Sequence, residues 1–406
     1  MNLVSDRLGP GFEPGSFYVL DGGMASCLAN HLPERSVDQD PLWGAGATHT
    51  QPDAVRAVHE EFLNAGAQII TTNTYQCSLA MFKSHLSLDH PHVDAPKLFK
   101  QAVDLARKAI ENVKGQAFGS ALVAGSVGPY GACLGDGSEY TGAYLDHVSS
   151  EELEAFHFDR IQGLAQAGVD IMAVESQPSV VEALAILNVF EKFPGVKCWI
   201  SFQCRNETET ARGEPFEKVV QALLSHPASR FKLKAIGVNC TRPEFISPLL
   251  TVANKVNLGG SKVPYIVYPN SGENWDGVNK CWSGDQMEDY ILTHIEEWMR
   301  LGACVIGGCC RIQPKTIGKI KAQVVENIFH VMGQSTRLEA REPTWASIEA
   351  SFKVLETSKT GKEKKRIAKA KTADPIFPFP LIPGVNDPTS LDRVHQDILQ
   401  RFKQSS

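Results

Sequence analysis

The chain has 406 residues, of which 43% are hydrophobic and 21% charged, and its 46 acidic and 40 basic residues give a net charge of -6. This composition excludes an intrinsically disordered protein and argues against general affinity for nucleic acid. The first ten residues lack the pattern of a signal peptide, and no apolar run approaches the roughly 18 residues that span a bilayer. We expect a soluble, cytoplasmic protein that binds small molecules, as a monomer or a homodimer.

Eight short runs rich in β-branched residues recur between residues 17 and 310 and predict strands. They are FYVLDGG (17–23), AQIITTNT (67–74), ALVAGSVG (121–128), VDIMAVES (169–176), KCWISFQC (197–204), KAIGVNC (234–240), VPYIVYPN (263–270) and ACVIGGCC (303–310). Helical patterns separate them, as in the segment where Val55, Val58 and Phe62 share one face. Almost wholly apolar strands suit a parallel sheet that is covered on both faces. We therefore predict an α/β fold of the (β/α)8 TIM barrel type rather than an open doubly wound sheet.

The composition changes after the last predicted strand. Residues 353–371 contain eight Lys or Arg against two Glu, and PIFPFPLIP (375–383) contains four prolines in nine positions. We predict a barrel over residues 1–335 and a C-terminal extension over residues 336–406. A solvated helical face is the ordinary role of such a basic stretch, with a nuclear signal or an acidic partner as alternatives. The proline run is expected to lie extended against the barrel, before a last short helix near residues 391–402.

Three of the ten cysteines fall at predicted strand ends, where the loops of one barrel face build the active site. Cys240 closes the sixth run, and Cys309 and Cys310 close the eighth behind two glycines. Three thiolates form a soft set for Zn²⁺ with a fourth position left open, which is typical of catalytic zinc. The alternatives are core packing and a vicinal disulfide between Cys309 and Cys310. Core packing is the role we expect for the other seven, Cys27, Cys77, Cys133, Cys198, Cys204, Cys281 and Cys304.

The motifs at these strand ends resemble those of the homocysteine S-methyltransferase family. GVNC (237–240) and GGCC (307–310) resemble its two zinc motifs, and DGG (21–23) resembles its first-strand motif. Four more segments resemble the branch that uses sulfonium donors, above all S-methylmethionine: TTNTYQCS (71–78), SVGPYGACLGDGSEYTGAY (126–144), AVES (173–176) and YPNSGENW (268–275). The likeness covers roughly residues 15 to 325.

This resemblance implies a zinc-dependent methyltransferase that moves a methyl group from S-methylmethionine, or from S-adenosylmethionine, to the thiolate of homocysteine and so makes methionine. It implies that Cys240, Cys309 and Cys310 bind the zinc, and that Asp21 and Glu175 hold the amino group of homocysteine. Without the resemblance, each of these two carboxylates reads as an ordinary helix cap. The remaining implied contacts to homocysteine are Gly22, Gly23, Thr72, Thr74 and Asn239.

The resemblance also bears on the methyl donor. Betaine-using relatives have tyrosines where this chain has Ser176 and Gln76, which argues against betaine. Trp43 and Tyr130 are candidates for an aromatic wall over the sulfonium, because π faces stabilise such cations. Asn270 and Glu273, with the neighbouring Ser271 and Asn274, are candidates for reading the amino-acid part of the donor. Loop packing and loop capping are the ordinary alternatives for all of these residues.

Two other functions stay open at this point. One is a methyltransferase with the same site whose acceptor is selenocysteine, because the sequence does not separate this acceptor from homocysteine. A non-catalytic zinc barrel, acting as a thiol sensor or as a scaffold through its basic tail, is the second alternative. The presence of both Asp21 and Glu175 beside an open zinc position argues against it.

Overall fold

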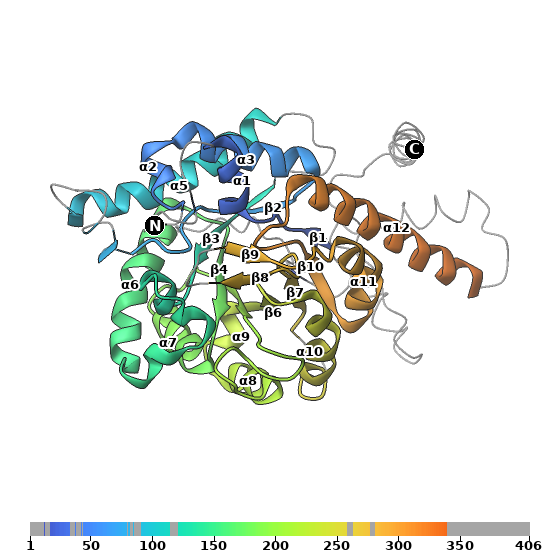
Figure 1. The fold of residues 1–406 in the computed structure, drawn as a ribbon. Coiled ribbons are helices and arrows are strands. Elements are labelled where there is room, and N and C mark those ends of the chain that lie inside the picture. Colours follow the sequence, from blue (N-terminus) through green and yellow to red (C-terminus); the bar gives the residue numbers. More distant parts are fainter. Residues whose placement is uncertain are drawn as a thin grey trace, which may run out of the picture.

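Eight strands in the described part of the chain form one closed parallel barrel surrounded by helices (Figure 1). The computed structural model describes residues 12, 17–32, 37, 42, 44–78, 80–81, 84, 91–113, 121–257, 263–276 and 281–338. The order of strands around the sheet is β1-β10-β7-β6-β5-β4-β3-β2, and all neighbours run parallel. A parallel bridge between Leu20 and Ile69 joins the two ends of this order and closes the barrel. The predicted (β/α)8 fold is confirmed.

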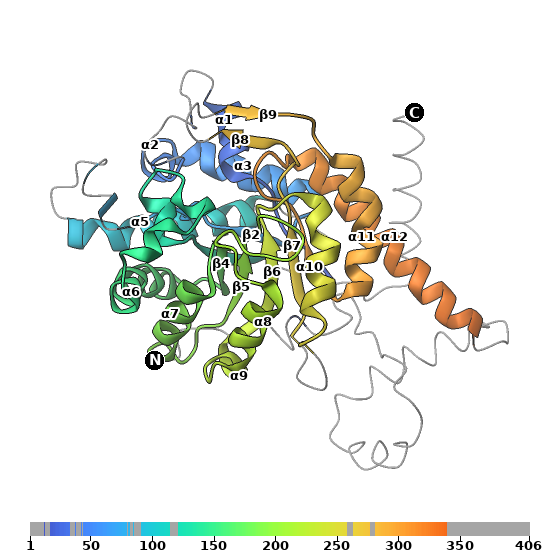
Figure 2. The ribbon, with the colours of Figure 1, turned by 60° about the horizontal axis from the view of Figure 1, so that its bottom comes forward.

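All eight predicted runs contain a barrel strand. The strands are β1 (Tyr18–Val19), β2 (Ile69–Thr71), β3 (Leu122–Val127), β4 (Ile171–Gln177), β5 (Cys198–Phe202), β6 (Leu233–Asn239), β7 (Tyr265–Tyr268) and β10 (Ala303–Ile306). A short antiparallel hairpin of β8 (Asn274–Asp276) and β9 (Cys281–Ser283) follows β7. It lies at the end of the barrel where the strands finish (Figure 2).

The helices that surround the barrel follow the strands in alternation. They are α1 (Met24–His31), α2 (Ala47–Thr50), α3 (Pro52–Ala65), α5 (Pro91–Asn112), α6 (Ser150–Ala167), α7 (Val180–Glu191), α8 (Phe216–Ser225), α9 (Ser229–Lys232), α10 (Ile246–Ala253), α11 (Glu288–Leu301) and α12 (Pro314–Leu338). Short 3₁₀ turns lie at η2 (Tyr130–Cys133), η3 (Ser138–Tyr140), η4 (Ala143–Asp146) and η5 (Pro243–Phe245). None of the helices in the described part of the chain is long and apolar enough to cross a membrane.

Helix α3 shows how the sequence pattern produces these elements. Pro52 occupies its first turn, where a missing N–H costs nothing. Val55, Val58 and Phe62 are buried on one face, as predicted. Gly66 ends the helix with φ of 103°, a left-handed conformation that glycine adopts without strain.

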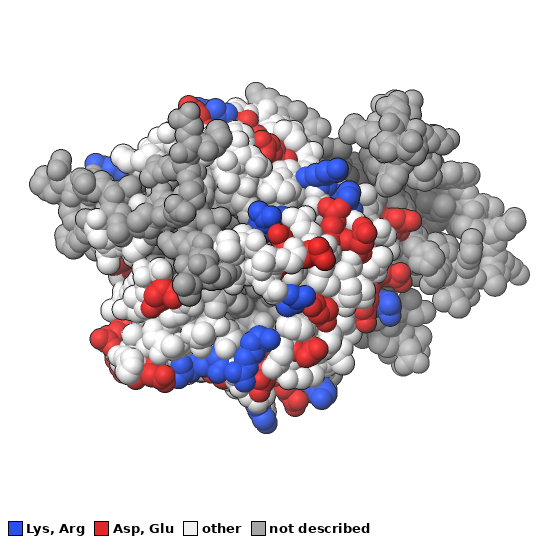
Figure 3. All heavy atoms as spheres, in the orientation of Figure 1, with Lys and Arg blue, Asp and Glu red and all other residues white. Residues whose placement is uncertain are grey.

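Apolar side chains form two layers, one inside the barrel and one between the strands and the helices. The inner layer includes small residues such as Ala124, Ala173 and Ala235 around the large indole of Trp199. The outer layer is larger and joins the helices to the other face of the strands. Figure 3 shows acidic and basic side chains interspersed over the coloured part of one outer face.

The loop between β3 and α6 is attached to α7 through the buried carboxylate of Glu182. This carboxylate accepts the backbone N–H of Tyr130 at 2.6 Å and the hydroxyl of Tyr144, and it lies 2.7 Å from Nε2 of His157. Arg160 donates to the carbonyl oxygen of Gly128 and to that of Tyr75 in the loop after β2, each at 2.7 Å. The loop that carries Tyr130 to Tyr144 is therefore anchored at several points.

The predicted division into a barrel of residues 1–335 and an extension of residues 336–406 stays a prediction. Helix α12 ends at Leu338, and the basic stretch, the proline run and the last predicted helix lie outside the described residues.

We expect the folded protein to lose stability as the pH falls because of the buried side chain of His59. This side chain of α3 is fully buried, and neither ring nitrogen has a hydrogen-bond partner in the described part of the chain. Burial lowers the pKa of His59 to about 4, against a small opposing effect of Glu60. The unfolded chain therefore binds the proton first, so the stability present above pH 6.5 falls by about 1.4 kcal/mol per pH unit down to pH 4.

Replacing His59 with leucine removes this contribution. Urea unfolding at pH 7, 5.5 and 4.5 should show a shallower loss of stability in His59→Leu than in the unmodified protein. Equal losses in the two proteins would contradict the assignment, because all other titrating groups are common to both.

Candidate active site

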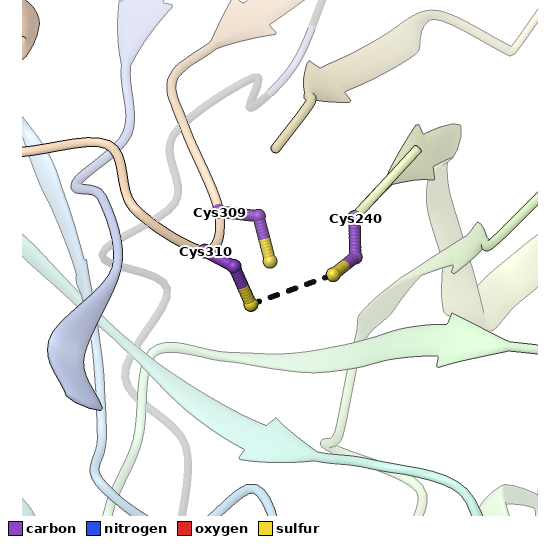
Figure 4. Close-up of side chains that lie close together, drawn as sticks. All are labelled: Cys240, Cys309 and Cys310. Atoms are coloured by element: carbon purple, nitrogen blue, oxygen red, sulfur yellow. Dashed lines mark hydrogen bonds between the residues drawn. The ribbon is translucent and has the colours of Figure 1, made fainter. Parts of the chain in front are cut away.

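Three thiols meet at the mouth of the barrel. Cys240 follows β6, and Cys309 and Cys310 follow β10 (Figure 4). Their Sγ atoms all lie within 4.8 Å of one another, and the Sγ atoms of Cys240 and Cys310 are 3.5 Å apart. Four ligands at 2.3 Å around a tetrahedral zinc place neighbouring sulfurs about 3.8 Å apart. The three predicted ligands could therefore hold one metal ion, and sulfur is a ligand that zinc favours.

The three thiols would also need a neighbouring cation in order to ionise together. Hydrogen bonding to Cys309 and Cys310, followed by burial, raises the pKa of the Cys240 thiol well above its ordinary value. Three neighbouring thiolates repel one another in a buried place, so they cannot all be ionised unless a positive ion lies between them. The set of residues fits a metal and is poorly suited to three free thiols.

The backbone brings the thiols to one point by leaving regular strand geometry. Asn239 faces the barrel interior, so the next residue of a regular strand would face the helices. Cys240 instead has φ of 47°, a left-handed conformation that turns its side chain over the mouth. Just after β10, a Cβ on Gly307 would lie 2.6 Å from the side chain of Leu20, and a Cβ on Gly308 would lie 2.2 Å from that of Ile312. Only glycine allows the chain before the cysteine pair to pass this closely.

Two buried carboxylates share the pocket with the thiols. Asp21 is 2% exposed and accepts the backbone N–H of Thr71 at 2.7 Å and the Thr71 hydroxyl. Glu175, at the end of β4, accepts the hydroxyl of Ser126. Neither carboxylate forms an ion pair with a residue in the described ranges. Both lie at the strand ends where we expected them, and their contact with homocysteine stays a prediction.

Burial is the main cause that raises the pKa of both acids. The pKa of Glu175 rises to about 8, and the charge of Cys309 adds to the effect. The pKa of Asp21 is also well above its ordinary value, with Thr71 opposing the effect of burial. Buried carboxylates without a cation are costly, and they are frequent at functional sites where a cationic ligand restores their charge.

One pocket contains both groups. The predicted residues that line it are Asp21, Gly22, Gly23, Thr72, Glu175, Cys240, Cys309 and Cys310. Sequence reasoning did not assign contacts to several other lining residues, including Met24, Tyr75, Gln76, Ser126, Tyr140, Ser176, Gln203 and Tyr268. Six of these eight lie in segments that carried the family resemblance, which was the available signal for them: Tyr75, Gln76, Ser126, Tyr140, Ser176 and Tyr268.

Two predicted homocysteine contacts do not line the pocket. Thr74 donates its hydroxyl to the carbonyl of Ser126 at 2.8 Å, and it lies 2.7 Å from the hydroxyl of Thr72. Asn239 accepts the backbone N–H of Ser176 at 2.7 Å, and its Nδ2 lies 3.9 Å from Sγ of Cys309. Both side chains support the walls of the pocket from behind.

The predicted donor contacts also lie away from this pocket, as far as the structure describes them. The ring of Tyr130 packs against Tyr144 and Phe156. Asn270 accepts the N–H of Gly272 at 2.9 Å, which is a loop-capping role. Glu273 forms an ion pair with Arg311 at 3.1 Å and accepts the hydroxyl of Ser271 at 2.8 Å. Asn274 accepts an N–H of Arg242 at 3.0 Å, and Trp43 lies outside the described residues.

The other seven cysteines are free thiols, and so are the three of the cluster, so the structure contains no vicinal disulfide. Five of the seven are buried and Cys133 is half-buried, in agreement with core packing. Cys281 is exposed, so the predicted core position is wrong for it. It lies on β9 of the hairpin, whose two short strands form a separate sheet outside the barrel.

The fold and this site define a barrel enzyme with a thiol cluster and two buried acids at its catalytic mouth. The chain belongs to the homocysteine S-methyltransferase family, whose model matches residues 18–324. It is accordingly a methyltransferase that acts on homocysteine.

Individual relatives agree with this membership. A Drosophila melanogaster protein named betaine-homocysteine S-methyltransferase is 40% identical over 312 residues, covering 75% of this chain and 92% of that relative. The homocysteine S-methyltransferase of Escherichia coli is 38% identical over 314 residues, covering 75% and 94%. The crystal structure of the Escherichia coli homocysteine methyltransferase MmuM in its metallated form aligns with a TM-score of 0.64 and 35% identity, over 76% of this chain and 96% of that one.

Proposed function

We propose that the protein is a zinc-dependent enzyme that transfers a methyl group from S-methylmethionine to the thiolate of L-homocysteine, giving methionine. The observation that carries this proposal is the presence of three convergent thiols and two buried carboxylates in one pocket. The thiols match a metal that binds sulfur, and the carboxylates match the ammonium of an amino acid.

Cys240, Cys309 and Cys310 would hold the zinc. When bound, zinc keeps the thiol of homocysteine deprotonated at neutral pH, whereas a free thiol with a pKa near 8.5 is mostly protonated. Asn239 directs Nδ2 toward Cys309 and holds the backbone after Glu175, so it keeps the thiol cluster and the acid in register. No side chain then has to act as a general base.

Asp21 and Glu175 would bind the ammonium of homocysteine. A single ammonium has three N–H donors, and two carboxylates on opposite sides of it can accept all of them. Thr71 and Ser126 orient the two acids through the hydrogen bonds described above. The acceptor would then lie with its amino group near the ends of β1 and β4 and its sulfur toward the ends of β6 and β10.

The transfer itself demands alignment more than chemical activation. A sulfonium donor carries one positive charge, and it leaves as a neutral thioether once the methyl group has moved. The protein mainly has to hold the nucleophile, the methyl group and the leaving group in line. Tyr75 and Tyr140 line the pocket, and their π faces suit a cationic donor.

Donor preference tests this proposal. We expect S-methylmethionine to be used best, S-adenosylmethionine second and betaine negligibly, because betaine has no N–H group and leaves any buried hydrogen-bond acceptor unpaired. That loss amounts to about 1 to 3 kcal/mol. Metal-replete protein should be assayed with homocysteine and the three donors in competition at equal concentrations.

Betaine turnover equal to that of S-methylmethionine would refute the proposed donor. It would instead indicate that this chain uses betaine, the donor that appears in the name of its Drosophila melanogaster relative. The same assay with selenocysteine in place of homocysteine tests the alternative acceptor.

A further inference from the structure

Most polar side chains that line the pocket already have partners within the protein. The engaged groups are the hydroxyls of Thr71, Thr72, Ser126 and Tyr268, the hydroxyl of Ser176, and the amide nitrogens of Asn73 and Gln76. Under the proposed function, the carboxylates of Asp21 and Glu175 bind the ammonium of homocysteine. Few hydrogen-bonding groups are left to recognise a second substrate.

Gln203 is the pocket residue that stands out among those left. Its Oε1 is shielded from solvent and has no hydrogen-bond partner among the described residues. A buried oxygen without a donor costs about 1 to 3 kcal/mol, so such an atom calls for an explanation. Gln76 also has an unpaired Oε1, but its Nε2 is held by the carbonyl of Ala132 at 2.9 Å.

Gln203 lies at the mouth of the barrel, close to the strands that carry the thiol cluster and Glu175. Trp199 and Ser201 on β5 face the barrel interior, where both lie within hydrogen-bond distance of the Tyr268 hydroxyl. Side chains alternate along a strand, so Gln203, two residues further on, continues this inward row at the mouth. Strand β5 pairs with β4 on one side and β6 on the other. Gln203 thus stands between the strand that carries Glu175 and the strand that carries Cys240.

We propose that Gln203 determines donor specificity by accepting a hydrogen bond from the α-ammonium of the methyl donor. This inference rests on the proposed function, which supplies an amino-acid donor. An ammonium gives an N–H to the unpaired oxygen after a rotation of the terminal amide. Betaine has a quaternary nitrogen and a carboxylate, so it offers no N–H and leaves Oε1 unpaired.

The test is the nearly isosteric change Gln203→Met, which removes the amide and keeps the volume. We expect the KM for S-methylmethionine to rise about tenfold, with kcat, the KM for homocysteine and the zinc content unchanged. The dissociation constant for S-methylmethionine, measured by calorimetry, should rise by the same factor. Gln203→Glu keeps an acceptor at this position and should restore tight binding.

A donor without the amino group isolates the contact. Dimethylsulfoniopropionate has the sulfonium and a carboxylate but no α-ammonium, so Gln203→Met should use it as well as the unmodified protein does. Gln177→Met is the matched control, because Gln177 also has an unpaired buried Oε1 but does not line the pocket. This control should keep the original ratio between the two donors.

The outcomes separate the two levels of the proposal. Equal losses with both sulfonium donors in Gln203→Met, or an unchanged KM for S-methylmethionine, would overturn the role of Gln203 and leave the proposed function intact. Absence of turnover with both S-methylmethionine and S-adenosylmethionine in the unmodified protein would overturn the proposed function and the role of Gln203 together.

Discussion

Replacing Cys240, Cys309 or Cys310 with serine is expected to remove both bound zinc and methyl transfer while the barrel stays folded. Serine offers a hard, protonated oxygen where the cluster needs a soft thiolate, so each change leaves two sulfur ligands. Loss of an outer-shell partner alone costs a metal site about 10- to 100-fold in affinity or activity, and loss of a ligand should cost more. The barrel core does not depend on the cluster, unlike a zinc finger that folds around its metal.

Metal analysis and an activity assay on the same samples check this result. Cys198→Ser is the matched control, because Cys198 is a buried thiol at the start of β5, the end of that strand away from the mouth. The control should keep a full equivalent of zinc. A ligand variant that also keeps a full equivalent and normal turnover would show that the assignment of that cysteine is wrong.

Glu175→Gln is expected to weaken homocysteine binding by roughly ten- to a hundredfold. The change keeps the shape of the side chain and removes one charge-assisted hydrogen bond to the ammonium, which contributes about 1.5 to 3 kcal/mol. The thiol cluster is untouched, so the zinc content should stay the same. The apparent affinity for homocysteine at saturating donor is the measurement.

The exposed Glu191 at the end of α7 offers a control for the loss of one negative charge. Glu191→Gln should bind homocysteine normally. If Glu175→Gln also binds homocysteine with unaltered affinity, the carboxylate does not contact the substrate, and orientation of the loop after β4 would be its remaining role.

The barrel was predictable because its strands are encoded locally. Apolar runs such as those of β4 and β6 are buried on both faces, and the glycine that ends α3 adopts the left-handed conformation its position requires. The short hairpin after β7 was not predicted. Its strands are three residues each, which is too short for an alternation of apolar residues to be recognised in the sequence.

The site was predictable where strand ends alone decide the position. Asp21, Glu175 and the three cysteines lie at strand ends or within a few residues after them, and parallel strands bring their ends to one mouth. Residues on long loops were not predictable, as Tyr130 and Glu273 illustrate, because distant partners on other elements fix their side chains. The left-handed conformations of Ser176 and Cys240 were not predictable either, because they break the alternation of inward and outward side chains along a strand.

The anchoring of the loop between β3 and α6 has a consequence for the order of events in catalysis. One carboxylate, Glu182, holds the backbone of Tyr130 and the side chains of Tyr144 and His157, and Tyr140 lies within the same loop. The entropy of ordering this wall is therefore lost when the chain folds, and neither substrate has to supply it on arrival. Because this loop is ordered before either substrate binds, it does not require one substrate to bind before the other. As far as this loop is concerned, homocysteine and the donor can enter in either order.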